Sequence, residues 1–352
     1  MSYGGLPQVN RTTARCVPIT VQPFHAPHRV RMPLVRLAAG LGVLVLIGQI
    51  VGAAPFRDGL DAVTAPAIVA VVALTVMTTL CSAWRWRVLA RGLGVTIPLP
   101  GAVGAYYRSQ FLNSVLPGGV VGDVHRAVAQ GRRAGDVGRG LRAVGWERFG
   151  GQLVQAVVTA VVLLALPSPV RSVLPVILTC AVGAGLVGLL GMRAVARRGG
   201  SRLTRAARAV LADLRHGLFA REVWPQLTLA SVLVVAGHTT TFILAARIAG
   251  CTAPTGDLLA LAMLVQTAMV IPLSIGGWGL REGAAAWAFA AAGLGASMGV
   301  TVTTVYGVLA LLAVVPGAAL LMADATRHTR VGTPARTEPV DDAPLELEAI
   351  GG

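Results

Sequence analysis

The sequence lacks lysine entirely and carries few charges of either sign. Charged residues make up 13% of its 352 positions, and all 30 basic residues are arginines, set against 15 acidic ones. Soluble domains carry about 25% charged residues, so this composition excludes a soluble globular chain. The hydrophobic content of 55% and the mean hydropathy of +0.70 indicate instead a polytopic α-helical membrane protein.

The sequence signatures of metal, disulfide and soluble-enzyme chemistry are also missing. The cysteines stand singly, with no CxxC pair and no histidine at metal-ligand spacing: Cys16, Cys81, Cys180 and Cys251. No GK[ST] or HExxH motif occurs, and the GGVVG run (residues 118–122) is not a GxGxxG fingerprint. We therefore expect no cofactor, no metal and no catalytic residue. An ATP-driven process would need a nucleotide site on a partner.

The arginines lie in loops between apolar stretches rather than in one basic domain. This distribution argues against nucleic-acid binding and is typical of loops that face the cytoplasm and anionic lipid. The segment RWRVLARGLG, for example, carries Arg85, Arg87 and Arg91 directly after an uncharged run. We assign this segment and both termini to the cytoplasmic side of the cell (plasma) membrane.

Six stretches are long enough and apolar enough to cross a bilayer. They cover residues 37–56, 62–84, 149–170, 172–192, 223–246 and about 301–322. A multi-pass transmembrane domain is therefore predicted over residues 34–324. Disordered cytoplasmic tails are predicted on either side of it, at residues 1–33 and 325–352.

Two runs rich in proline and glycine interrupt the apolar pattern. FLNSVLPGGVVGDVHR covers residues 111–126, and IPLSIGGWGLREG covers residues 271–283. Irregular backbone at membrane depth is tolerated only where protein covers it or where it lines a polar cavity. We predict two re-entrant broken-helix hairpins at corresponding positions of a possible inverted repeat, which is where transporters place their substrate sites. A rival count makes 258–280 a complete span.

Each broken run ends in an acid and an arginine. Asp123 and Arg126 are three residues apart and share a helix face, whereas Arg281 and Glu282 are adjacent. An arginine fork suits phosphate oxygens, and charges at this depth are costly and rarely idle. The plainer interpretation is that each pair only holds helices together as a neutral ion pair.

Four further polar residues stand at the same apparent depth. Glu147 and Arg148 open the third predicted span, and because neighbouring residues point to different faces of a helix, one of them is expected to face a cavity. His238 is more simply explained as a helix–helix hydrogen bond than as a proton relay. Asn113 is a candidate for capping or holding the backbone of the first break.

The motifs NSVLPGGVVGDVHR, WERFGG (residues 146–151) and IPLSIGGWGLREG resemble the flippase-like transmembrane region of the lysylphosphatidylglycerol synthase family over roughly residues 34–324. The resemblance implies a domain that carries an aminoacylated phospholipid, or in some members a polyprenyl-linked sugar intermediate, between leaflets. The full synthases also have a soluble aminoacyl-transfer domain, whereas only residues 325–352 follow here, so we expect a transporter rather than an enzyme. The candidate substrate-binding positions are Asn113, Pro117, Gly118, Gly119, Gly122, Asp123, Arg126, Glu147, Arg148, Pro272, Gly276, Gly277, Gly279, Arg281 and Glu282.

The leading hypothesis is a lipid flippase in which Arg126 and Arg281 hold the phosphate of an anionic or lipid-linked substrate. Asp123 and Glu282 would balance their charge or exchange protons. One alternative is a non-transporting accessory subunit of a membrane glycosyltransferase or envelope-assembly system, partnered by envelope-biosynthesis enzymes. Another is a secondary transporter of small solutes. A lateral opening to lipid favours the first two, and a closed water-filled cavity the third.

Overall fold

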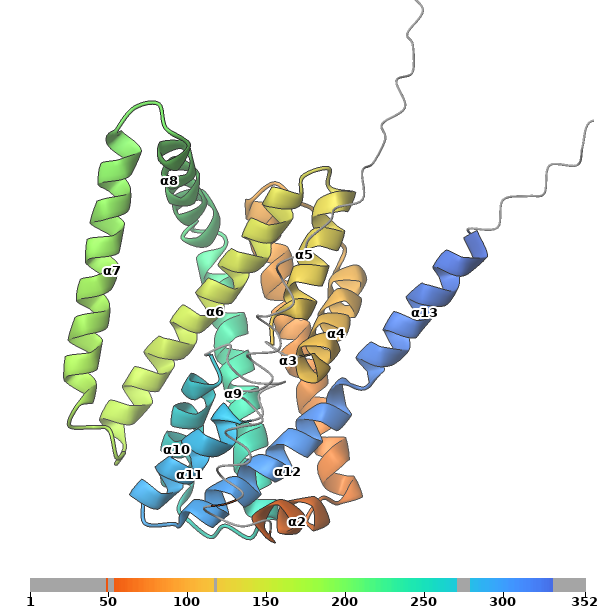
Figure 1. Ribbon diagram of the computed structural model, residues 1–352, viewed down its shortest axis with the longest axis vertical. Helices are drawn as coiled ribbons and strands as arrows, with labels where there is room; N and C mark the ends of the chain where they lie inside the picture. Colours follow the sequence, from red (N-terminus) through yellow and green to blue (C-terminus); the bar gives the residue numbers. More distant parts are fainter. Residues whose placement is uncertain (1–48, 50–53, 117–118, 271–278, 332–352) are drawn as a thin grey trace, which may run out of the picture.

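The computed structural model describes residue 49 and residues 54–116, 119–270 and 279–331, which form a bundle of helices (Figure 1). Within these ranges the chain contains no β-strand, which confirms the all-α prediction. The predicted tail at 1–33 lies outside the described residues, as do most of the first predicted span at 37–56 and the end of the chain from residue 332.

Five segments of the described chain are long and apolar enough to cross a membrane. They are α3 (Ala65–Gly92), α6 (Val137–Ala165), α7 (Leu174–Arg197), α9 (Trp224–Ile248) and the segment Ala296–Asp324, which combines α12 (Ala296–Val314) with the start of α13 (Pro316–Val331). These match five of the six predicted spans. Helices α3, α7 and α9 have proline in the first turn, where its missing N–H costs nothing. Helix α13 runs beyond the predicted boundary at 324.

A pair of short helices flanks each predicted break. Helices α4 (Leu99–Val115) and α5 (Val121–Arg133) flank the first, and α10 (Thr255–Ala268) and α11 (Leu280–Ala291) flank the second. The members of each pair pack against one another. Helix α10 has 14 residues, about 21 Å, which is shorter than the hydrocarbon core. Residues 258–280 are therefore not one continuous helix, as the rival count required. Entry of either pair into a bilayer stays a prediction.

The helix contacts repeat between the two halves. Helices α3 and α9 pack against each other at the centre, and exchanging α3, α4, α5 and α6 for α9, α10, α11 and α12 maps one set of contacts onto the other. The contacts α3–α6, α5–α6 and α4–α12 thus have counterparts in α9–α12, α11–α12 and α10–α6. The loops that flank the two short pairs lie at opposite ends of the bundle (Figure 1). This is the arrangement that the proposed inverted repeat requires.

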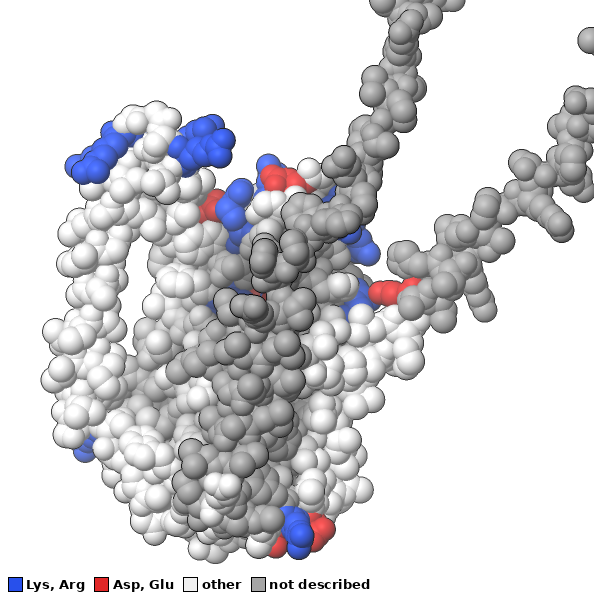
Figure 2. Space-filling model, viewed as in Figure 1, with Lys and Arg blue, Asp and Glu red and all other residues white. Residues whose placement is uncertain are grey.

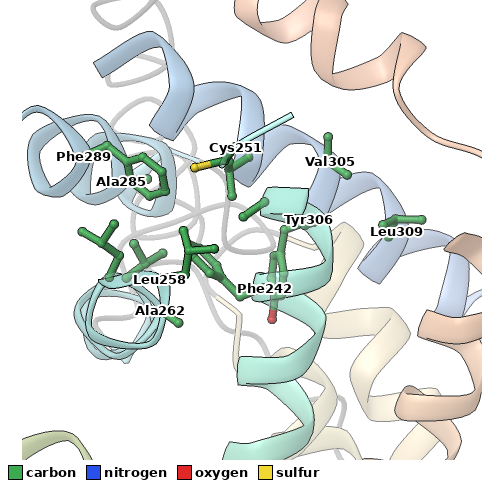
Figure 3. Close-up of a cluster of buried hydrophobic side chains, with 14 of the residues drawn as sticks. Phe242, Cys251, Leu258, Ala262, Ala285, Phe289, Val305, Tyr306 and Leu309 are labelled. Atoms are coloured by element: carbon green, nitrogen blue, oxygen red, sulfur yellow. The ribbon is translucent and has the colours of Figure 1, made fainter. Parts of the chain in front are cut away.

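A buried apolar cluster fixes the second short pair. Phe242 of α9 lies against Phe289 of α11 and Tyr306 of α12, with ring centroids 6.4 Å and 6.1 Å away (Figure 3). Leu258 and Ala262 of α10 complete the packing. Burying aromatic rings is among the larger stabilising contributions available to a core, so α11 and its polar first turn are firmly placed.

Helix α7 stands at the edge of the bundle and contacts mainly α6 and α8 (Arg202–Ala212), which is followed by the π-helical turn η1 (Asp213–Leu218). Of the residues of α7, only Leu174 is buried. In Figure 2, most of the visible positive charge gathers at the end of the molecule where α7 meets α8 and α5 meets α6. The short amphipathic helix α2 (Ala54–Asp61) lies at the opposite end.

This asymmetry predicts the orientation of the protein. Because positive loops stay in the cytoplasm, a single cysteine placed at Arg205 on α8 should react with a membrane-impermeant thiol reagent only after the membrane is opened. A cysteine at Asp58 on α2 should react in intact cells. Both variants are made in a background without the four native cysteines, and the reverse labelling pattern would contradict the assignment.

Candidate functional site

A single buried carboxylate, that of Glu147 on α6, joins four helices. Its Oε1 accepts hydrogen bonds from Arg85 Nε on α3 at 2.8 Å and from Tyr106 Oη on α4 at 2.9 Å, and Arg85 Nη2 also donates to it. Its Oε2 accepts from Arg126 Nη2 on α5 at 2.6 Å. The Glu147 side chain is 0% exposed. A charge buried so deeply is tolerable only because partners compensate it.

A second carboxylate, that of Asp123, ties α4 to the first turn of α5. Ser109 Oγ and Asn113 Nδ2 donate to it from α4 at 3.0 Å and 3.2 Å. Arg126 Nε donates to it at 2.9 Å, and Arg148 Nη2 lies 2.5 Å from it. Asn113 Oδ1 also accepts a hydrogen bond from the backbone N–H of Gly122 at 2.8 Å. The Asn113 side chain therefore holds the backbone at the start of α5, as expected.

Two glycines allow this close packing. A Cβ on Gly122 would lie 2.1 Å from the carbonyl oxygen of Ser109, so any side chain there would push α4 and α5 apart. A Cβ on Gly151, in the WERFGG motif, would lie 2.6 Å from Arg85 Nη1. Gly122 therefore allows α4 and α5 to pack closely, and Gly151 allows the Arg85 guanidinium to lie against the backbone of α6.

Two of the three arginines of this cluster, Arg126 and Arg148, have different surroundings. The guanidinium of Arg126 lies 4.7 Å from the ring centre of Trp86 and 4.3 Å from that of Tyr106, and its side chain is 1% exposed. The side chain of Arg148 is 43% exposed, and it borders a cavity. Arg126 Nη1 and Arg148 Nε are buried and have no hydrogen-bond partner among the described residues.

The second broken run contributes the polar first turn of α11. Arg281 donates through Nε and Nη2 to Glu282 Oε1 at 2.9 Å and 2.6 Å. Glu282 Oε2 accepts the N–H of Gly279 at 2.6 Å. The Arg281 guanidinium lies 5.6 Å from the ring centre of Tyr306, which links it to the apolar cluster. Both charged side chains are at most 2% exposed.

One cavity of about 820 Å³ connects the two regions. Arg85, Asp123 and Arg148 border it from the first cluster, and Arg281 borders it from the second. Its other polar lining residues come from α3, α4, α6, α9, α10 and α12: Thr75, Thr78, Ser82, Tyr106, Gln110, Asn113, Ser114, Gln152, Gln155, His238, Thr241, Gln266 and Tyr306. Ligand sites commonly have volumes of about 300–1,000 Å³. Described residues next to the two breaks, far apart in the sequence, thus border one space.

The placement of the candidate residues differs from the sequence expectations at several points. Helix α6 begins at Val137, so Glu147 and Arg148 lie inside it and do not open a span at 149. The apolar-run rule started this span too late because Glu147 and Arg148 are compensated by residues of α3, α4 and α5. His238 borders the cavity and shows no hydrogen bond among the described residues, where a helix–helix bond was expected. Five candidates lie outside the described residues: Pro117, Gly118, Pro272, Gly276 and Gly277.

Sequence reasoning missed Arg85, which it assigned to a cytoplasmic loop. Helix α3 continues to Gly92, and Arg85 is buried beside Glu147. A signal was present: Thr75, Thr78, Ser82 and Arg85 recur at helical spacing along one face of an otherwise apolar helix. Tyr106 was also missed.

The geometry defines a class of protein: a polytopic helical membrane protein with a polar cavity between two interrupted helix pairs. Comparison with known families agrees, because residues 34–317 match the lysylphosphatidylglycerol synthase TM region. The chain belongs to this family, as the sequence resemblance predicted. No curated protein and no solved structure gives a significant match.

The four-helix junction at Glu147 predicts a large stability effect. Glu147→Gln should lower the free energy of unfolding by about 3–5 kcal/mol, because Arg85 and Arg126 would lose their compensating charge in the interior. Reversible unfolding in mixed micelles measures this. The control is Arg139→Gln, which removes an exposed ion pair with Asp136 and should cost less than about 1 kcal/mol. Equal costs for the two variants would contradict the assignment.

Proposed function

We propose that the protein binds the phosphate-bearing headgroup of an anionic lipid in the shared cavity and moves it between leaflets. The observation that carries the proposal is that Arg148, which pairs with Asp123 of the first broken run, and Arg281 of the second broken run border one cavity. Guanidinium groups bind phosphate oxygens in a bidentate manner, and burial strengthens such contacts.

The accessible arginine of the first region is Arg148. Its ion pair with Asp123 leaves Nε without a hydrogen-bond partner among the described residues, and its side chain borders the cavity. Arg126, which the sequence favoured, is enclosed by two aromatic rings and two carboxylates. We therefore assign phosphate contact to Arg148 and Arg281. Arg126 is assigned the role of positioning Asp123 and Glu147.

An apolar groove favours a lipid over a soluble anion. A space of about 480 Å³ runs along the outer face of α5, lined by Val120, Val121, Val124, His125, Val128, Ala129 and Arg132. Val120 and Val124 also border the polar cavity, so the two spaces adjoin. A lipid with its headgroup in the cavity would place an acyl chain along this groove. This arrangement requires no burial of the headgroup in hydrocarbon.

A transport assay tests the proposal. Purified protein in proteoliposomes should move tail-labelled phosphatidylglycerol between leaflets, as measured by the fraction of label that an external quencher reaches. Arg148→Gln should slow this movement about tenfold or more, because a charge-assisted hydrogen bond contributes about 1.5–3 kcal/mol.

The matched control is Arg142→Gln. Arg142 lies on the same helix, its side chain is also 43% exposed, and it also makes one ion pair, with Asp213 at 3.1 Å, but it does not border the cavity. It should transport as the unaltered protein does. Equal losses in both variants would contradict the site. Binding of the lipid without movement would assign the protein to the accessory-subunit alternative.

A further inference from the structure

The corner where α7 meets α8 is strongly basic. Residues 193–215 contain seven arginines and one acid, Asp213, whose carboxylate is already paired with Arg142 on α6 at 3.1 Å. All seven arginines are exposed, and none makes an ion pair within the part of the chain that the structure describes: Arg193, Arg197, Arg198, Arg202, Arg205, Arg208 and Arg215. The α7–α8 corner, residues 193–215, therefore presents a group of positive charges at the surface.

These arginines belong to a folded element rather than to a loose connector. Ser201 Oγ accepts the backbone N–H of Thr204 at 3.1 Å and thereby caps α8. Arg208 Nε donates to the carbonyl oxygen of Ala196 on α7 at 2.8 Å, which joins the two helices. Leu218, the last residue of η1, is 0% exposed and anchors the segment in the bundle. The backbone that carries the arginines is thus fixed on both sides of α8.

Helix α8 separates its side chains by face. Thr204 and Ala207 are buried and point towards the bundle. The side chain of Leu203 is 73% exposed in the first turn. The arginines of α8 recur every third residue and therefore share the outer side of the helix: Arg202, Arg205 and Arg208. A helix that combines a basic face with a projecting apolar side chain is typical of elements that lie on an anionic membrane surface.

The position of the α7–α8 corner along the bundle fits such a surface. Helix α7 has 24 residues, about 36 Å, which is enough to cross a hydrocarbon core of about 30 Å. It ends at Arg197, and α8 begins five residues later at Arg202. The arginines therefore follow directly on the apolar stretch, where lipid headgroups begin. Figure 2 shows positive charge on both helices at this corner.

We propose that the α7–α8 corner binds the anionic lipid headgroups of the leaflet at this end of the bundle, with Leu203 inserted among the lipids. None of its seven arginines borders the polar cavity, so this is a second lipid contact, separate from the candidate site. The proposal does not rest on the proposed transport. Its basis is the charge complementarity between a fixed group of arginines and an anionic surface.

An alternative occupant of the α7–α8 corner is the end of the chain itself. Residues 332–352 contain five acids and one arginine. This segment continues from α13, which lies on the other side of the bundle from α7 and α8 (Figure 1). Lipid headgroups would instead lie next to the corner wherever α7 crosses a bilayer. We therefore favour lipid, and the test below includes a chain that ends at residue 331.

The test places an environment-sensitive dye on Leu203→Cys in a variant without the four native cysteines. The protein is reconstituted in nanodiscs of phosphatidylcholine, alone or mixed with increasing fractions of phosphatidylglycerol. In the anionic discs the dye emission should shift to shorter wavelength, and lipids that carry a quencher near the headgroup should quench it. Raising the salt concentration to about 1 M should reverse the shift, because it screens surface charge.

Charge removal at the α7–α8 corner identifies the residues responsible. Arg202→Gln combined with Arg205→Gln should weaken the association of the dye-labelled corner with phosphatidylglycerol discs about tenfold or more, because each arginine near an anionic surface contributes to binding. The matched control combines Arg91→Gln with Arg139→Gln. These two arginines are also exposed and lie at the same end of the bundle, but outside the α7–α8 corner. The control should leave the shift unchanged.

Three results would overturn the proposal. The first is a dye emission that is the same in neutral and anionic discs. The second is an equal loss of the shift in both pairs of arginine variants, which would assign it to the overall charge of the protein. The third is a shift already present in neutral discs that disappears when residues 332–352 are deleted, which would assign the α7–α8 corner to the end of the chain. A shift that requires phosphatidylglycerol and survives this deletion would support lipid as the occupant.

Discussion

The buried Glu147 carboxylate is the contact on which the rest of the site depends. It holds Arg85 and Arg126 together in a region where neither could remain alone, and it thereby joins α3, α4, α5 and α6. Removing one partner of such a group leaves an uncompensated charge, which costs far more than the pair itself contributes. The charges at this point are therefore interdependent. Arg148, the next residue in the sequence, borders the cavity.

The two halves of the molecule contribute different numbers of charged side chains to the surroundings of the cavity. The first region brings a network of several paired charges, and the second brings one adjacent pair supported by the aromatic cluster around Tyr306. In both regions the arginine lies over an aromatic ring, and the acid accepts from the arginine of its own half. The two halves thus share a pattern of helix contacts, as an inverted repeat requires, but they form unequal walls of one cavity.

The sequence was sufficient for five of the six predicted spans, for the ends of the helices that flank the two interruptions and for both acid–arginine pairs, because long uncharged runs and Pro-Gly breaks are local signals. It was insufficient to decide which of two arginines, Arg126 or Arg148, borders the cavity. That choice depends on how α5 and α6 are rotated against each other, and Gly140 of α6 packs there directly against the backbone of Ala127 and Gly131 of α5. Arg85 was assigned to a loop because charge normally ends a span, whereas here a carboxylate from α6 keeps it inside the helix.

The central claim is that one anionic lipid contacts arginines from both regions at once. A double-mutant cycle with Arg148→Gln and Arg281→Gln, read out as the affinity for phosphatidylglycerol, tests it most directly. If one ligand joins the two residues, their effects should deviate from additivity by at least about 0.5 kcal/mol. Effects that add within about 0.3 kcal/mol would contradict a single shared site.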